Sequence, residues 1–160
     1  MHMRAILGLL TAGLVLGSLG IFSVPAPEAA PLSTGKPAKD TTMHLEQNWD
    51  KTFPQSDKVT HQKVTFQNRY GITLAADLYR PRQATGKMAA IAVSGPFGAV
   101  KEQASGLYAQ TMAERGFLTL AFDPSFTGES GGRPRHVASP DINTEDFSAA
   151  VDYLTTREDV

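Results

Sequence analysis

Two short apolar segments with a helical pattern between them limit the fold of this chain most strongly. Residues 88–93 (MAAIAV) and 117–122 (FLTLAF) carry no charge, which is typical of strands buried on both faces of a sheet. Residues 99–115 predict a helix between them, and Gly116 follows as its C-terminal stop. Two strands joined by a helix with short connections form a βαβ unit, in which the strands are parallel. The predicted buried face of the helix consists of Val100, Ala104, Leu107, Tyr108 and Met112.

An antiparallel hairpin is predicted ahead of this unit. Residues 59–68 and 71–81 have strand patterns, and the segment NRYG (68–71) supplies the turn between them. The second strand alternates apolar residues on one face, namely Ile72, Leu74, Ala76 and Leu78. The sequence therefore predicts an α/β fold, in which an antiparallel β-hairpin leads into a parallel βαβ sheet.

A loop over residues 123–140 and a second helix complete the pattern. Asn143 is the expected N-cap, and Glu145 and Asp146 are expected to complement the positive end of the helix dipole. The predicted buried stripe of this helix consists of Phe147, Ala150, Val151 and Leu154.

The first 30 residues have the layout of an export signal. Arg4 precedes an uncharged, largely apolar stretch (residues 5–24), and small residues follow it. That stretch is also long enough to span a bilayer, so residues 1–30 predict either a cleaved signal peptide or an N-terminal membrane anchor. Both alternatives predict an exported protein, periplasmic or extracellular, and the second tethers it to a membrane. Residues 31–58 are predicted to be a linker and lead-in, which Trp49 and Phe53 anchor onto a domain starting near Val59.

Composition narrows the classes of function. The formal net charge is -1 and 19% of the residues are charged, so there is no electrostatic case for nucleic-acid binding. The absence of cysteine excludes a lipoprotein anchor, disulfide bonds and thiolate chemistry. No pair of histidines has metal-ligand spacing on a helix face, so we expect neither a metal nor a cofactor.

The segment GESGG (residues 128–132) matches the serine-hydrolase pattern G-x-S-x-G, which makes Ser130 a candidate nucleophile. A nucleophile elbow stands directly between a strand and a helix, but the apolar strand segment ends at Phe122, eight positions earlier. The residues after Ser130 include two Gly and two Pro and cannot begin a helix at once. The context therefore favours a loop serine whose hydroxyl binds local backbone. Asp123 and His136 lie in the same loop, so they do not form a triad held by separate rigid elements.

Residues 59–160 resemble the N-terminal half of an alpha/beta-hydrolase. They are most similar to exported bacterial members related to dienelactone hydrolases and to the Xaa-Pro dipeptidyl-peptidase-like group. Four segments carry the resemblance: DLYRP, IAVSGPFGAVKEQ, AERGF and LAFDPSFTGESGG. The signal or anchor helix predicted from the layout of residues 1–30 would precede this hydrolase domain.

The resemblance implies roles for two loops. The segment with Asp123, Gly128, Glu129 and Ser130 would shape the mouth of the active site without being the elbow. The segment SGPFG (94–98) matches the oxyanion loop, but Ser94 replaces the usual histidine and Pro96 has no N–H to donate. Phe97 or Gly98 would then supply the donor, and a simple strand-to-helix turn is the alternative interpretation.

The resemblance also implies an exported serine hydrolase of the esterase or peptidase type, acting on a small-molecule ester or peptide. The catalytic serine, acid and histidine would follow in that order beyond Val160, so we expect residues 1–160 alone to be inactive. The alternative is a non-catalytic binding module, secreted or tethered to a membrane, on a hydrolase-derived scaffold. In the family's strand order the segment AAIAV would have a bare edge, which predicts self-association.

Overall fold

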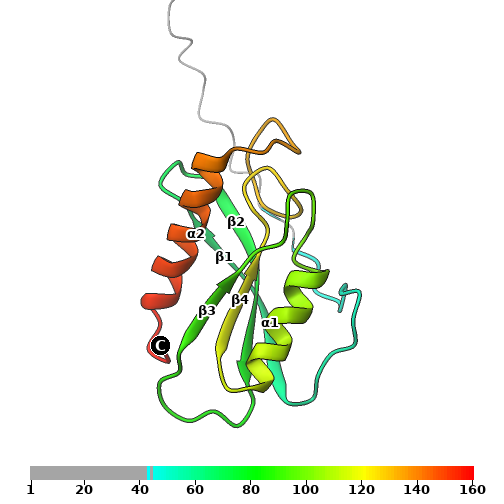
Figure 1. Ribbon diagram of the computed structural model, residues 1–160, viewed down its shortest axis with the longest axis vertical. Coiled ribbons are helices and arrows are strands. Elements are labelled where there is room, and N and C mark those ends of the chain that lie inside the picture. The colour runs from blue at the N-terminus through cyan, green and yellow to red at the C-terminus, as the bar shows by residue number, and fades with distance from the viewer. Residues whose placement is uncertain (1–42, 44) are drawn as a thin grey trace, which may run out of the picture. The chain divides into compact units, whose positions relative to one another are not determined.

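Four strands form one open sheet in the order β1-β2-β4-β3 (Figure 1). Their bounds are β1 (Val59–Gln67), β2 (Thr73–Pro81), β3 (Ala90–Val93) and β4 (Leu118–Phe122). Two helices, α1 (Ala104–Glu114) and α2 (Pro140–Thr155), pack against opposite faces of this sheet. The computed structural model describes Met43 and residues 45–160, and the proposed export signal lies outside these residues.

Strand directions give the sheet a mixed character. β1 pairs antiparallel with β2 from Val59↔Pro81 to Gln67↔Thr73, and β2 pairs antiparallel with β4. β3 and β4 run parallel and are joined by α1, which is the βαβ unit that the two apolar segments predict. The α/β class predicted from the sequence is confirmed.

The core is divided between the two faces of the sheet by the alternation of side chains along β4. Leu118, Leu120 and Phe122 pack in one cluster with Ala150 and Leu154 of α2. Ala121, on the other face, belongs to a second cluster with Ala109 and Ala113 of α1. All five residues of β4 are buried, because strands flank it on both sides and helices cover both faces.

β3 differs from the expected strand in its burial. The sequence predicts residues 88–93 as a strand buried on both faces, whereas β3 spans Ala90–Val93 and all four of its residues are half-buried. The reason is its place at the edge of the sheet, because β4 is its only strand neighbour among the described residues. Pairing of this edge with another chain stays a prediction.

The face of α1 that packs on the sheet is not the predicted one. Leu107 and Tyr108 are 47% and 53% exposed, whereas Gly106, Ala109 and Ala113 are buried. Gly106 lets α1 lie close to the Lys101 backbone and the Phe53 ring because it has no side chain. A Cβ atom at this position would lie 2.2 Å from the backbone oxygen of Lys101 and 3.1 Å from the Phe53 ring. The helix also begins at Ala104 and not at residue 99, because residues 99–103 form turns.

α2 begins earlier than predicted, and its N-cap is Ser139. Pro140 is the first residue of α2. Proline suits this position because its φ is already helical and its missing N–H would have no intrahelical partner. Asn143 lies inside the helix, where its N–H donates to Ser139 O at 2.8 Å, so the predicted N-cap is wrong. Of the predicted stripe, Ala150 and Leu154 are buried, whereas Phe147 and Val151 are 43% and 50% exposed.

Glu145 and Asp146 also have a different role from the predicted one, because they connect α2 to its neighbours. Glu145 Oε2 lies 2.9 Å from Arg69 Nε, in the turn after β1. The Asp146 carboxylate accepts hydrogen bonds from the Asn68 side chain and from the Ser125 N–H, each at 2.8 Å. These contacts hold the helix against the turn after β1 and the loop after β4.

The lead-in packs onto the sheet through the two aromatic residues predicted as its anchors. Trp49 Nε1 donates to Phe53 O at 2.8 Å, and Phe53 packs with Val59 and Tyr79.

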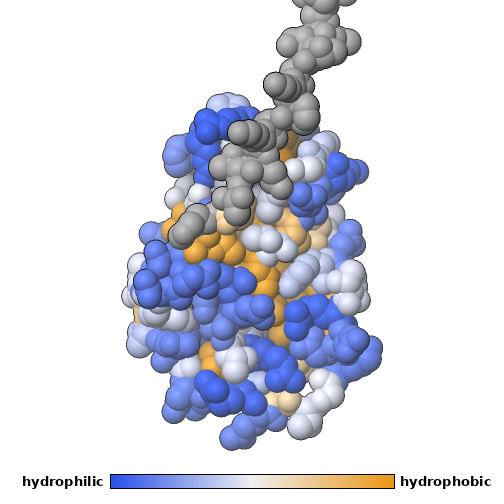
Figure 2. Space-filling model, turned by 180° about the vertical axis from the view of Figure 1, so that it is seen from behind, coloured by the Kyte–Doolittle hydropathy of each residue, from blue (hydrophilic) through white to orange (hydrophobic). Residues whose placement is uncertain are grey.

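On the face opposite to that of Figure 1, hydrophilic side chains border a central band of hydrophobic ones (Figure 2). None of the helices in the described part of the chain has the length and apolar character needed to cross a membrane.

The packing of α1 predicts an unusual effect of replacing Gly106 with alanine. Alanine in place of glycine inside a helix normally stabilises it by about 1 kcal/mol. Here the added methyl group would meet the backbone of Lys101, and overpacking costs about 1–3 kcal/mol. We expect Gly106→Ala to lower the free energy of unfolding, measured by urea denaturation.

The matched control is Leu107→Ala in the next position of the same helix. Its side chain is half-exposed, so the change is expected to cost no more than about 0.5–1 kcal/mol. A larger loss for Leu107→Ala than for Gly106→Ala would restore the face that the periodicity predicts.

Candidate active site

Two loops meet where the parallel strands β3 and β4 end. The loop after β3 covers residues 94–103, and the loop after β4 covers residues 123–139. Because parallel strands place their carboxyl ends at one edge of a sheet, both loops lie at the edge where open α/β sheets bind ligands. The Ser94 hydroxyl donates to Phe122 O at 3.2 Å and so connects the start of the first loop to the end of β4.

Ser130 is buried in the second loop, and its hydroxyl binds only backbone. Its Oγ donates to Asp123 O at 2.6 Å and accepts a hydrogen bond from Ala75 N at 2.8 Å. Only 2% of the residue is exposed, whereas His136 is exposed at the surface. Within the described residues no hydrogen bond joins Ser130 to His136. This geometry favours the structural role that the sequence context predicts for Ser130.

The glycines of GESGG have structural reasons of their own. Gly128 has a φ of 53°, and a Cβ atom on it would lie 2.1 Å from Asp123 Oδ2. Gly132 has a φ of 95°, and its Cβ would lie 2.6 Å from the ring of Phe126. Each position therefore needs a residue without a side chain. The catalytic-looking pattern arises from the packing of a tight loop.

The carboxylate of Asp123 holds the two loops together. Asp123 has no exposed surface; its Oδ1 accepts the Lys101 N–H at 2.8 Å and its Oδ2 accepts the Lys101 ammonium group at 2.9 Å. Oδ2 also accepts the Glu129 N–H at 2.9 Å. A buried carboxylate requires such compensation, because an unpaired charge in the interior is very costly.

A second lysine extends this pair into a network. Lys101 Nζ lies 2.6 Å from Glu129 Oε2 and 2.5 Å from Glu102 Oε1. Lys63 Nζ lies 2.8 Å from the same Glu129 oxygen and 2.7 Å from Asp50 Oδ2. The network therefore joins the lead-in, β1 and both loops.

The lead-in supplies a third lysine. Lys51 Nζ has no exposed surface and lies 2.5 Å from Asp50 Oδ1. It also lies 3.1 Å from Asp77 Oδ2, although the angle leaves that oxygen without a hydrogen bond. The other oxygen of Asp77 is 2.7 Å from His61 Nε2. Altogether, three lysines neutralise most of the charge of five carboxylates, which belong to Asp50, Asp77, Glu102, Asp123 and Glu129.

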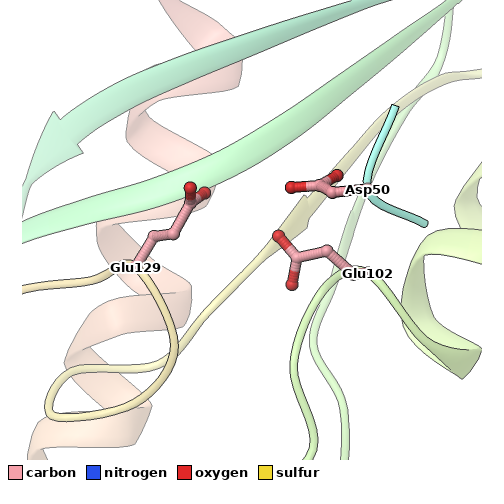
Figure 3. A group of neighbouring side chains, drawn as sticks. All are labelled: Asp50, Glu102 and Glu129. Carbon is pink, nitrogen blue, oxygen red and sulfur yellow. The ribbon is translucent and has the colours of Figure 1, made fainter. Parts of the chain in front are cut away.

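Asp50, Glu102 and Glu129 point toward one another (Figure 3), and each offers an oxygen within 4.8 Å of the others. Among the described residues this is the one group with three potential metal ligands in reach. The Lys63 and Lys101 ammonium groups already bind these carboxylates. The arrangement is therefore that of an ion-pair network.

The lysines lower the pKa values of two of these carboxylates, Glu129 and Asp50. Burial alone would raise the pKa of Glu129, but hydrogen bonds from the Glu46 N–H, Lys101 and Lys63 outweigh it and lower this pKa to about 2. Burial likewise opposes ionisation of Asp50, yet hydrogen bonds from Lys51 and Lys63 lower its pKa to about 2. Burial would lower the pKa of Lys101, but the charge of Asp123 and hydrogen bonds to the surrounding carboxylates raise it above its ordinary value.

The candidate oxyanion loop forms a turn over Pro96–Ala99, which precedes Lys101 in the sequence. Ala99 N donates to Pro96 O at 2.9 Å, and Gly98 has a φ of 84°, as the third position of a type II turn requires. Phe97 is 69% exposed at the tip. Neither the Phe97 nor the Gly98 N–H donates to an acceptor within the described part of the chain.

Sequence reasoning missed the lysine network. Asp77 carried a usable signal, because it is an acidic residue inside the otherwise apolar strand segment LAADLY. Lys101 carried none, because a lysine in a polar loop usually lies in solvent. Its partners, Asp123 and Glu129, are 22 and 28 positions away in the sequence.

Relatives of this chain are found among bacterial and fungal proteins, although no family model matches it. The uncharacterized protein PA2218 of Pseudomonas aeruginosa is 60% identical over 157 residues, which are 98% of this chain and 42% of the relative. A thiohydrolase of Eupenicillium brefeldianum is 32% identical over 104 residues, which are 65% of this chain and 33% of that protein. The chain thus spans about two-fifths or less of the length of the curated relatives described here.

Solved structures agree with this similarity. The crystal structure of PA2218 matches 74% of this chain and 37% of its own chain, with a TM-score of 0.72 and 72% identity. The alpha/beta hydrolase GrgF of Penicillium sp. sh18 matches 60% of this chain and 32% of its own, with a TM-score of 0.54 and 27% identity. The described residues have an alpha/beta-hydrolase-type fold. Est1E of Butyrivibrio proteoclasticus, solved with ferulic acid, shares this hydrolase fold: it matches 61% of this chain and 39% of its own, with a TM-score of 0.54 and 25% identity.

The low pKa values of Glu129 and Asp50 predict sensitivity to acid. Both values are lower in the folded chain than their ordinary values of 4.5 and 3.8, so their contribution to stability is complete above about pH 4.5 and is lost as the pH falls toward 2. Because both side chains are partly exposed to screening solvent, we expect about 1–2 kcal/mol from each. Urea unfolding at a series of pH values would measure this loss.

Glu129→Gln is expected to flatten the curve over that range, because glutamine does not titrate. Glu114→Gln, at the exposed end of α1, is the control and should leave the slope unchanged. Equal slopes for Glu129→Gln and the unaltered protein would show that Glu129 does not carry the pH dependence.

Proposed function

We propose that this chain contributes the oxyanion loop and the mouth of the active site to an exported serine hydrolase that cleaves acyl esters or thioesters. One observation carries the proposal: the Phe97 and Gly98 N–H groups, which donate to no acceptor within the described residues, lie in the loop after β3 that Lys101 attaches to Asp123. Donors arranged in advance at such a position stabilise the negative oxygen of a tetrahedral intermediate.

The proposed nucleophile is a serine outside the described residues, because the Ser130 hydroxyl is already bound to Asp123 O and Ala75 N. Its oxygen bonds to the acyl carbon while a histidine base removes its proton, and the carbonyl oxygen gains the negative charge. Collapse of this intermediate expels the alcohol or thiol, which takes the proton from the base. Water then repeats both steps and releases the acid and the free serine.

The names of the relatives support the substrate class. The fungal relative is called a thiohydrolase, and Est1E was solved with ferulic acid bound. These names favour acyl esters and thioesters over peptides.

We expect the complete gene product to hydrolyse p-nitrophenyl butyrate and a short acyl thioester. A fluorophosphonate probe is expected to stop both reactions by modifying one serine, because such probes react with activated serine nucleophiles. Peptide mapping by mass spectrometry should find the label outside residues 45–160.

Ser130→Ala is the matched control for this experiment. It should still take the label, while losing about 1–3 kcal/mol of stability because the buried Ala75 N–H loses its acceptor. Loss of the label in a folded Ser130→Ala protein would make Ser130 the nucleophile. A folded wild-type protein with neither hydrolysis nor labelling would contradict the enzymatic proposal.

Export is a separate part of the proposal, and the layout of residues 1–30 supports it. A cleaved signal predicts that the protein from the periplasm or medium begins at Pro27, after the segment VPA (24–26), or at Ala30, after the segment PEA (27–29). An uncleaved anchor predicts Met1 retained in the membrane fraction. N-terminal sequencing distinguishes them, and a cytosolic protein that keeps residues 1–30 would contradict both.

A further inference from the structure

We propose that Lys101 and Asp123 are positioning residues, which hold the Phe97 and Gly98 N–H groups where an oxyanion would form. This inference rests on the proposed function. Lys101 follows Gly98 by three residues in the loop after β3, and Asp123 is the first residue after β4. Neither residue touches the reacting atoms in this proposal; they act through the loop backbone between them.

The segment from Ser94 to Lys101, which contains the oxyanion loop, is attached at both ends to Phe122 and Asp123, the last residue of β4 and the residue after it. At its start, the Ser94 hydroxyl donates to Phe122 O at 3.2 Å. At its other end, the Lys101 N–H donates to Asp123 Oδ1 at 2.8 Å and the Lys101 ammonium group donates to Asp123 Oδ2 at 2.9 Å. Between these attachments the backbone forms the Pro96–Ala99 turn, and the Val100 N–H donates to Gln103 Oε1 at 3.4 Å.

The two bonds from one residue to both oxygens of one carboxylate set orientation as well as position. A single hydrogen bond would let the loop rotate about it, whereas two bonds to the two oxygens do not. The same carboxylate accepts the Glu129 N–H, so it also sets the neighbouring loop that lines the mouth. A movement of Asp123 would therefore displace both loops together.

Stability alone is a poor explanation for this pair. Both side chains are fully buried, and apolar residues of similar volume often replace a buried ion pair without loss of stability. What apolar residues cannot supply is directional attachment of the backbone. In a hydrolase, a misplacement of about 1 Å at catalytic groups can reduce the rate on the order of 100-fold.

The test compares three variants of the complete gene product. Lys101→Met removes the ammonium group and leaves the Asp123 charge unpaired. Lys101→Met/Asp123→Asn removes both charges and so limits the loss of stability. Lys51→Met is the matched control, because Lys51 is equally buried but pairs with Asp50 and Asp77 and not with a residue of either loop.

We expect kcat for p-nitrophenyl butyrate to fall about 10- to 100-fold in the single and the double Lys101 variants, with KM changed less than about twofold. Amide hydrogen exchange over residues 95–100 should accelerate in both, while exchange in α1 stays unchanged. Lys51→Met should lose stability but keep kcat and the exchange of this loop.

Any other outcome contradicts either the positioning role of Lys101 and Asp123 or the proposed hydrolase function. Recovery of kcat in the double variant, or an equal loss of kcat in Lys51→Met, would reduce the pair to a contribution to stability. Unchanged exchange over residues 95–100 would overturn the positioning role. If wild-type protein does not hydrolyse esters, the proposed function fails, and the exchange measurement still tests the attachment of the loop.

Discussion

The buried carboxylate of Asp123 is the constraint on which the rest of this edge of the molecule depends. An unpaired charge without exposed surface would be very costly, so three N–H donors must surround it. Those donors come from Lys101 and Glu129, which places both loops. The space that the carboxylate fills also excludes a side chain at Gly128, and the Asp123 carbonyl binds Ser130. Gly128 and Ser130 of the GESGG pattern thus follow from Asp123, whereas Gly132 follows from the ring of Phe126.

Local patterns were sufficient to predict the parallel pair of β3 and β4, because both strands are apolar and short and have a helix between them. They did not predict the antiparallel pairing of β2 with β4. The same patterns could not predict which face of α1 is buried. Leu107 and Tyr108 are the larger apolar residues and give the periodicity its phase, yet Gly106, Ala109 and Ala113 form the contact. The close contacts of the helix decide this, because a Cβ atom on Gly106 would meet the Lys101 backbone oxygen and the Phe53 ring, both outside α1.

The candidate site was predictable only where its residues are close in the sequence. The position of GESGG after β4 was enough to argue against Ser130 as an elbow, and the turn at Pro96–Ala99 follows from SGPFG. The ion-pair network was not predictable, because its members are far apart: Lys63 and Glu129 are separated by 66 positions. A charged residue in a single sequence resembles a surface residue until its partner is known.

The lead-in shows how far the influence of this network extends. A boundary at Val59 follows from the strand pattern, but residues from Met43 onward belong to the same compact unit as the sheet. The Glu129 carboxylate accepts the Glu46 N–H as well as the Lys63 and Lys101 ammonium groups. Because Glu129 is held at the same time by Asp123, the lead-in and the loop after β4 cannot move independently. The loop proposed to line the active-site mouth is therefore attached through Glu129 to Glu46, which precedes the first strand.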